Sequence, residues 1–182
     1  MHILDLVQNS IEAGASKVTL FINEDTKADS LIIRVADNGR GMDENTCRQV
    51  VDPFFTTRRT RRIGLGLPLI AMTTRQCQGH LNIKSVLGEG TEIEAVYKLS
   101  HIDRPPLGNI AETVKTIIIA NPHLDFAYCH TVNGNSLTLA TKEITDILGE
   151  ISLTHPDVLV WFDQYLTDQL INLYGGVKHE NS

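Results

Sequence analysis

Residues 31–42 read LIIRVADNGRGM, and this stretch joins a β-branched apolar run to a glycine-rich turn. The run at 31–35 has the residue types that strands favour, and the turn that follows contains Asp37, Gly39 and Gly41. An aspartate that ends a strand beside glycines presents a carboxylate where the backbone can approach a ligand closely. For this stretch alone an ordinary turn is the better interpretation, so its meaning depends on the segments around it.

The segments on either side of this turn predict alternating helices and hairpins. At about 100° per residue, Ile3, Leu6, Val7 and Ile11 form one apolar stripe of a first helix, which Gly14 is placed to end. Strands at 18–22 and 31–35 form a hairpin around a polar turn. A short helix at 43–51, a loop at 52–63, a helix at 66–77 and a hairpin of strands at 80–85 and 91–99 complete this part.

Residues 100–107 hold two adjacent prolines and no apolar periodicity, which is typical of a boundary between domains. We therefore expect a first domain at 1–100, a linker at 101–106 and a small α+β domain at 107–182. Within the last, the pattern predicts a helix at 108–120, a hairpin over 125–140, a helix at 141–148 and a final helix to about residue 174.

Charge and composition exclude several classes of protein. The 182 residues include 16 basic and 22 acidic side chains, a net charge of -6 that argues against a nucleic-acid surface over the whole molecule. The three cysteines are widely spaced and fit neither a disulfide framework nor a zinc site, so a reducing cytoplasm is the expected location. The longest nearly apolar stretch, at 63–72, is too short to span a bilayer, and we expect no membrane association.

Three further short motifs accompany the turn at Asp37. They are Asp5-x-x-x-Asn9 on the first helix, Gly64-x-Gly66-Leu67 at the start of a helix, and Gly88-x-Gly90-Thr91 in a hairpin. Each is weak alone. In this order, and with DPFFTT at 52–57, they resemble the N, G1, F, G2 and G3 boxes of the GHKL ATP-binding superfamily, which includes sensor histidine kinases, Hsp90 chaperones and MutL mismatch-repair ATPases.

The resemblance covers residues 1–99 and draws on two branches of the superfamily. DLVQNSIEAGA at 5–15 is most similar to the MutL version, whereas DPFFTT and GLGL at 64–67 resemble the histidine-kinase version. The resemblance implies a Bergerat fold, an α/β two-layer sandwich in which a mixed sheet carries helices on one face, with the C-terminal segment as a small α+β appendage. It also implies ATP and Mg²⁺ as ligands. The binding residues that it implies are Asn9, Asp37, Gly39, Gly41, Met42, Phe54, Arg58, Gly64, Leu65, Gly66, Leu67 and Thr91.

The chemistry of these residue types fits an adenine nucleotide. The Asp37 carboxylate can accept a hydrogen bond from the exocyclic amine of adenine, whereas guanine would offer an acceptor at that place. In the superfamily the asparagine that matches Asn9 gives an oxygen to Mg²⁺, although Asn9 also fits a polar solvent face. Gly64 and Gly66 precede a helix, whose free N–H groups favour phosphates. The superfamily's usual G-T-G-L-G-L is shortened here to RIGLGL at 62–67.

The loop between the turn at Asp37 and the motif at Gly64 corresponds to the superfamily's mobile ATP lid. It contains Arg58, Arg59, Arg61 and Arg62, and the arginine fork suits phosphate oxygens. For any single arginine a solvated loop position is the better interpretation, but we expect at least one to contact the triphosphate. Phe54 is either the apolar hinge of this lid or a core anchor.

The sequence leaves the reaction open. MutL and its ATPase relatives have a glutamate where this chain has Asp5, and a missing methylene can displace a general base by more than catalysis tolerates. One hypothesis is a nucleotide-dependent regulatory or kinase-like module whose C-terminal part acts on a protein partner. The alternative is a slow ATP hydrolase of the MutL type that uses Asp5 as its general base. A DNA-repair fragment is disfavoured by the acidic charge, and homodimer formation stays open.

Overall fold

The computed structural model describes residues 2–51 and 66–175. Over these residues the strands are β1 (Lys17–Asp25), β2 (Ser30–Asp37), β3 (His80–Val86), β4 (Gly90–Lys98), β5 (Asp125–Val132) and β6 (Asn135–Ala140). The helices are α1 (Ile3–Glu12), α2 (Glu44–Gln49), α3 (Gly66–Gln76), α4 (Ile110–Ala120), α5 (Thr141–Leu148) and α6 (Pro156–Gly175). None of the helices in the described ranges has both the length and the apolar character needed to cross a membrane.

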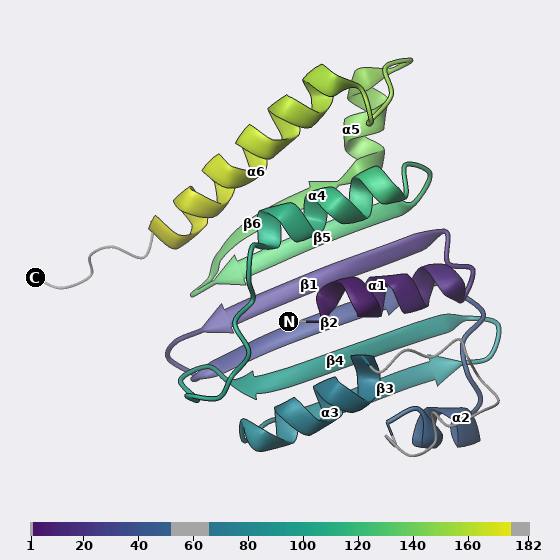
Figure 1. The fold of residues 1–182 in the computed structure, drawn as a ribbon, viewed down its shortest axis with the longest axis vertical. Coiled ribbons are helices and arrows are strands. Elements are labelled where there is room, and N and C mark those ends of the chain that lie inside the picture. The colour runs from purple at the N-terminus through teal and green to yellow at the C-terminus, as the bar shows by residue number, and fades with distance from the viewer. Residues whose placement is uncertain (1, 52–65, 176–182) are drawn as a thin grey trace, which may run out of the picture.

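All six strands belong to one mixed sheet with the order β3-β4-β2-β1-β5-β6 (Figure 1). Strands β1 and β5 pair in parallel, with Leu20 opposite Tyr128, and every other neighbouring pair is antiparallel. The β5–β6 hairpin therefore extends the sheet that the first hundred residues build.

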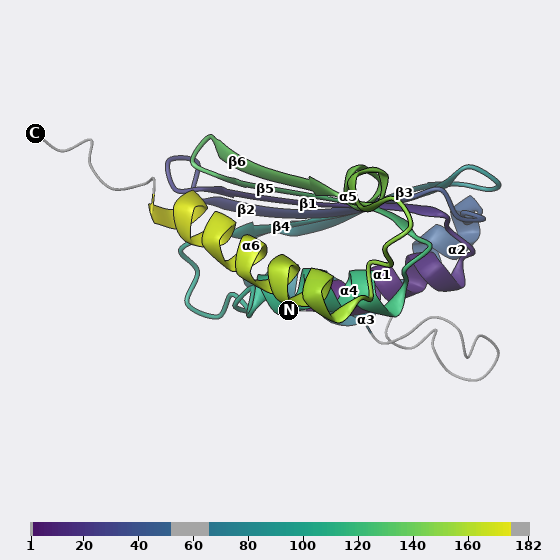
Figure 2. The same ribbon diagram turned by 90° about the horizontal axis from the view of Figure 1, so that it is seen from above.

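Helices α1, α3, α4 and α6 lie on the same face of this sheet (Figure 2). The strands alternate accordingly, since Val18, Leu20 and Ile22 of β1 are fully buried while the residues between them are partly exposed. A mixed sheet with helices packed on one face confirms the predicted two-layer α/β sandwich.

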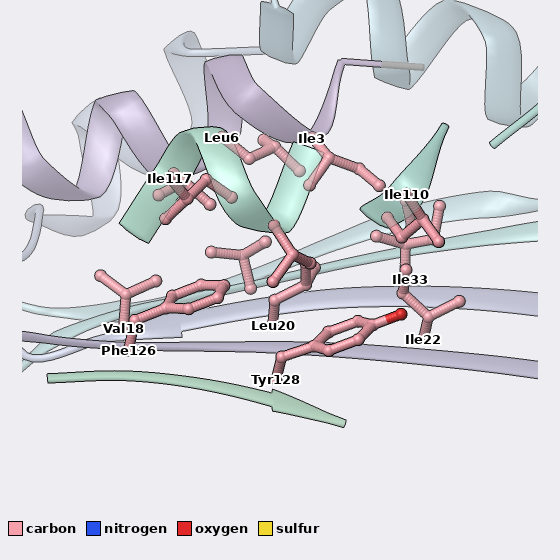
Figure 3. Packing of buried hydrophobic residues seen from close by; sticks show 14 of the residues in the cluster. Ile3, Leu6, Val18, Leu20, Ile22, Ile33, Ile110, Ile117, Phe126 and Tyr128 are labelled. Carbon is pink, nitrogen blue, oxygen red and sulfur yellow. The ribbon is translucent and has the colours of Figure 1, made fainter. Parts of the chain in front are cut away.

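The core lies between the sheet and the helices and draws residues from both halves of the chain (Figure 3). Figure 3 shows side chains of α1 and α4 packed above side chains of three strands: Ile3, Leu6, Ile110, Ile117, Val18, Leu20, Ile22, Ile33, Phe126 and Tyr128. Cutting one of the larger aliphatic members back to alanine would cost about 2–5 kcal/mol. The predicted boundary at 101–106 stays a prediction, although one buried cluster spans it.

The predicted helix at 43–51 is shorter in the structure because Asp43 caps it instead of entering it. The Asp43 carboxylate accepts hydrogen bonds from the backbone N–H and the hydroxyl of Thr46, both at 2.9 Å, as helix N-caps do. The same two bonds hold the pKa of Asp43 below its usual value. This short helix, α2, lies near the end of the sheet where β2 stops (Figure 1).

A buried polar cluster joins the far end of α6 to the sheet. His130 of β5 is fully buried, with its ring nitrogens 2.8 Å from the Tyr128 hydroxyl and 2.9 Å from the Glu24 carboxylate of β1. The hydroxyl of Tyr174, near the end of α6, donates to the same carboxylate. A hydrogen-bonded cluster of this kind fixes where α6 lies on the sheet.

Candidate functional site

A cavity of about 340 Å³ lies at the end of β2, between α1, α2, the start of α3 and strand β4. Its volume falls within the range of small-molecule sites. Six of the residues predicted from the sequence line it: Asn9, Asp37, Gly41, Met42, Leu67 and Thr91. These six residues come from four separate stretches of the chain, which the fold brings to one hollow.

The Asp37 carboxylate is held in a fixed orientation at the wall of this cavity. Its Oδ2 accepts a hydrogen bond of 2.7 Å from the hydroxyl of Ser10, and its Oδ1 accepts one of 2.8 Å from the backbone N–H of Gly39. Ser10 is buried on α1, and Gly39 is buried in the turn after β2. Because a carboxylate can accept about four hydrogen bonds, the Asp37 carboxylate can still accept one from a donor inside the cavity.

The turn after β2 is packed against the β3–β4 hairpin so closely that side chains are excluded from two positions. Gly41 has a φ of +65°, and a Cβ there would lie 2.0 Å from the carbonyl oxygen of Val86. Gly90 has a φ of +129°, and a Cβ there would lie 2.0 Å from the carbonyl oxygen of Asp37. Both glycines are required by this contact between backbones, which builds one wall of the cavity.

Ser85 of β3 connects three parts of the same wall. Its hydroxyl oxygen accepts a hydrogen bond of 2.7 Å from the backbone N–H of Met42 and donates one of 3.0 Å to the carbonyl of Gly90. The Thr91 hydroxyl lies 2.8 Å away. Since the single Ser85 proton goes to Gly90, Thr91 is the donor in this last bond, and its oxygen keeps free lone pairs beside the cavity.

Asn9 lines the cavity and carries an unpaired polar atom. Its side-chain nitrogen is buried and has no hydrogen-bond partner among the described residues. Leaving such a group unpaired costs about 1–3 kcal/mol. Asn9 is thus a half-buried residue of the cavity wall.

Asp5 and Gly66 lie against each other where α1 and α3 both begin. A Cβ on Gly66 would be 3.0 Å from the Cβ of Asp5. The Asp5 carboxylate is 56% exposed and lies 2.9 Å from the Nδ1 of His2. The structure therefore places Asp5 beside the N-terminal end of α3, and Asp5 is not among the residues that line the cavity at Asp37.

Sequence reasoning missed several residues of the site. Neither Ser10 nor Ser85 was recognised as a motif residue. Ser10 could have been linked to the site because it directly follows Asn9 on a helix, whereas no sequence signal indicates Ser85. Arg40 and Glu12 line the cavity as well. The predicted residues Phe54, Arg58, Gly64 and Leu65, together with Arg59, Arg61 and Arg62, lie outside the described part of the chain.

The two-layer mixed sheet and the cavity bounded by α1 and the glycine-rich turn define a Bergerat-type domain. Residues 2–101 match the family model described as histidine kinase-, DNA gyrase B-, and HSP90-like ATPase. The chain belongs to this family.

Similar proteins come from both branches that the motifs resemble. The sensor protein kinase FleS of Pseudomonas aeruginosa is 39% identical over 110 residues, which are 60% of this chain and 27% of FleS. The DNA mismatch repair protein MutL of Bacillus licheniformis is 28% identical over 170 residues, which are 86% of this chain and 25% of that protein. The chain thus spans about a quarter of the length of these relatives.

A solved structure, the Aquifex aeolicus MutL ATPase domain complexed with ADP, shares the fold. It aligns with a TM-score of 0.50 at 21% identity and covers 80% of this chain and 67% of the MutL chain. The alignment extends past residue 101, and β5, which pairs with β1, belongs to that later part of the chain.

Proposed function

We propose that this chain binds Mg²⁺–ATP in the cavity at the end of β2 and acts as a nucleotide-dependent regulator or kinase-like module on a protein partner. The observation that carries the proposal is the Asp37 carboxylate, which Ser10 and Gly39 hold in place at the cavity wall. A preoriented acceptor loses little entropy when a ligand donor meets it.

Adenine is the base that fits this acceptor. Its exocyclic amine donates to the free lone pairs of Asp37, and the Thr91 hydroxyl oxygen offers a second polar contact nearby. Guanine would set a carbonyl oxygen against the carboxylate, and an unmatched buried polar group costs about 1–3 kcal/mol. The same cavity should therefore discriminate between the two purines.

The triphosphate is assigned to the side of the cavity where α3 begins. Leu67 lines the cavity and Gly66 opens the helix, so the backbone N–H groups at this end suit phosphate oxygens. Gly64, Leu65 and Arg58 would add donors from the loop before α3, and Phe54 would be its hinge. Asn9 would give one oxygen to Mg²⁺, which neutralises phosphate charge and keeps most of its water ligands.

A route from the site to the C-terminal part runs through the core. Helix α1, which carries Asn9 and Ser10, packs its Ile3 and Leu6 against the sheet beside Ile110 and Ile117 of α4 (Figure 3). A change at the nucleotide would therefore reach the surface of the C-terminal part through packed side chains. The proposal places the protein in the cytoplasm, with its partner on that surface, and leaves a homodimer open.

A slow ATP hydrolase of the MutL type is the second candidate, because Asp5 lies directly beside Gly66. A carboxylate at that place would be near the phosphates assigned to the start of α3. The contact of Asp5 with His2, outside the residues that line the cavity, favours binding over hydrolysis.

Thermal unfolding with and without nucleotide tests the proposal. A ligand at about 100 times its Kd stabilises the folded state by about 2.7 kcal/mol. We expect Mg²⁺–ATP to raise the Tm of the parent chain and to leave that of Asp37→Asn nearly unchanged, while both proteins melt alike without nucleotide. An equal Tm shift in parent and variant would refute the assignment of Asp37.

A further inference from the structure

A second hollow, of about 410 Å³, opens between α5 and the first half of α6. Its wall is formed by Ile144, Ile147, Leu148, Asp157, Val158 and Trp161. We call it the α5–α6 groove. None of these residues lines the cavity at Asp37, so the two hollows are separate.

The groove exposes large apolar side chains. Ile147 is 85% exposed and Trp161 is 48% exposed, and the Trp161 ring stacks on Tyr165 with 5.1 Å between ring centroids. Ile151, directly beyond α5, adds another exposed side chain. Clustered apolar exposure on a folded surface marks a binding site, and tryptophan and tyrosine are frequent anchors in such interfaces.

Acidic side chains run beside the apolar stripe. On α5, Glu143 and Asp146 lie three residues apart and flank Ile147, so they form a row along one side of the stripe. Glu150 is exposed just past the helix end, and Asp157, on the α6 side, has a side chain that is 94% exposed and lies 3.7 Å from the Nδ1 of His155. The acidic side chains near the groove are thus Glu143, Asp146, Glu150 and Asp157, and the only lysine or arginine at 141–161 is Lys142.

This charge pattern selects the occupant. Two copies of the chain that met through their grooves would bring like charges together, and an anionic lipid surface would be repelled in the same way. A helix with apolar anchors on one face and lysines or arginines beside them complements both the stripe and the acidic row.

We propose that the α5–α6 groove binds an amphipathic, basic helix of a protein partner. The eight residues of α5 are about 12 Å long, which matches two turns of a bound helix and two or three anchors at i, i+4 and i+7. This inference rests on the proposed action on a protein partner and names the chemistry of that partner.

Fluorescence anisotropy with a designed probe tests the inference on the full chain. The probe is a fluorescein-labelled helical peptide of about 18 residues, with leucines on one face and lysines on the other. A matched peptide carries glutamates in place of the lysines. At about 0.15 M salt we expect saturable binding of the lysine peptide and at least about tenfold weaker binding of the glutamate peptide.

Paired variants locate the binding on the groove. We expect Ile147→Ser and Trp161→Ala each to weaken the lysine peptide by about fivefold or more, because they remove anchor contacts. Ile102→Ser, at a side chain that is 95% exposed elsewhere, is the control for Ile147. Asp157→Asn should weaken binding and reduce its salt dependence, whereas Asp168→Asn, with the same change in net charge, should do so far less.

Three results would overturn the inference: absence of saturable binding, equal losses in groove variants and controls, or a dimer in sedimentation experiments that Ile147→Ser dissociates. The Mg²⁺–ATP melting shift is recorded on the same samples. If Mg²⁺–ATP still raises the Tm but the peptide does not bind, only the proposed groove is refuted. If the peptide binds but Mg²⁺–ATP does not raise the Tm, only the proposed nucleotide site is refuted.

Discussion

Single residues set the geometry of the cavity at Asp37 through hydroxyl groups. Ser10 orients the carboxylate of Asp37, and Ser85 orients the hydroxyl of Thr91 while it ties Met42 to the hairpin. Both serines act on residues that face the cavity, so they are positioning residues. Loss of either hydroxyl would leave its partner free to rotate, and affinity would fall without loss of the fold.

Asn9 is the residue whose replacement separates metal binding from nucleotide binding. We expect Asn9→Ala to abolish the Mg²⁺ dependence of ATP binding and to leave metal-free ADP binding nearly intact, since the amide is assigned to the metal. The variant also removes a buried nitrogen that has no partner among the described residues, so its ligand-free stability should not fall by more than about 1 kcal/mol. A magnesium titration of ATP binding is the measurement, with Asn82→Ala as the exposed control. An unchanged titration in Asn9→Ala would rule the assignment out.

Asp5 decides whether the chain is an ATPase. We expect no phosphate release above background from the parent, because the carboxylate contacts His2 and is shorter than the glutamate of hydrolysing relatives. Asp5→Asn should then keep its ATP affinity, whereas Asp5→Glu is the variant in which we expect an increase in phosphate release. Removal of a working general base lowers the rate about 10²- to 10⁴-fold. Steady hydrolysis by the parent that disappears in Asp5→Asn would establish the MutL-type alternative.

The sequence predicted several residues that line the cavity, but it did not indicate the serines that orient them. Motif glycines and Asp37 could be found because close backbone approach and a carboxylate at a strand end leave a pattern in the sequence. Ser10 and Ser85 could not be found in this way, because each acts on a residue that is distant in the sequence. Asp37 is 27 residues from Ser10, and Met42 is 43 residues from Ser85. The roles assigned to Phe54, Arg58, Gly64 and Leu65 stay predictions.

Helix α6 is attached to the sheet by the Glu24–His130–Tyr174 cluster. Burial alone would raise the pKa of Glu24, but the hydrogen bonds from His130 and Tyr174 together with nearby positive charge hold that pKa below its usual 4.5. A carboxylate with a lowered pKa stabilises the fold fully above its unfolded pKa, and this stabilisation is lost as the pH falls through the lowered value.

Glu24→Gln should therefore destabilise the protein in a pH-dependent way. At about pH 7 we expect the free energy of unfolding to fall by about 1–3 kcal/mol, because the buried His130 loses its charged partner. Below about pH 4.5 the difference from the parent should begin to shrink, because Glu24 of the unfolded chain takes up a proton there, and it should be lost as the pH falls through the lowered pKa of the folded protein. Urea denaturation at a series of pH values measures this, with exposed Glu89→Gln as control. A difference that stays constant into acid would argue against the cluster.

At the scale of helices and strands, local sequence patterns predicted the elements better than they predicted which strands pair. The order of helices and hairpins follows from apolar periodicity and turn residues, and the first two hairpins form as expected. The parallel pairing of β1 with β5 joins strands about a hundred residues apart, and no local pattern indicates it. The hairpin of the C-terminal part thus extends the same sheet, while the predicted division into domains stays a prediction.

At the scale of the whole molecule, the cavity at Asp37 and the α5–α6 groove lie on one continuous framework. The cavity at Asp37 is built by the first half of the chain, and the α5–α6 groove is built by the last quarter, yet both rest on the same six-stranded sheet. Figure 1 shows the intervening helix α4 between α1 and α6. A nucleotide and a partner helix could thus influence each other through α1 and α4, and such coupling would be reciprocal.

The central claim is that the cavity selects an adenine nucleotide through Asp37, and calorimetric titration of the parent chain with Mg²⁺–ATP and Mg²⁺–GTP in one buffer tests it most directly. The account predicts that ATP binds more tightly than GTP by roughly 5- to 150-fold, the factor that corresponds to an unmatched polar group worth about 1–3 kcal/mol. It also predicts that Asp37→Asn removes most of this preference. Equal affinity of the parent for ATP and GTP, or no measurable binding of either, would contradict the account.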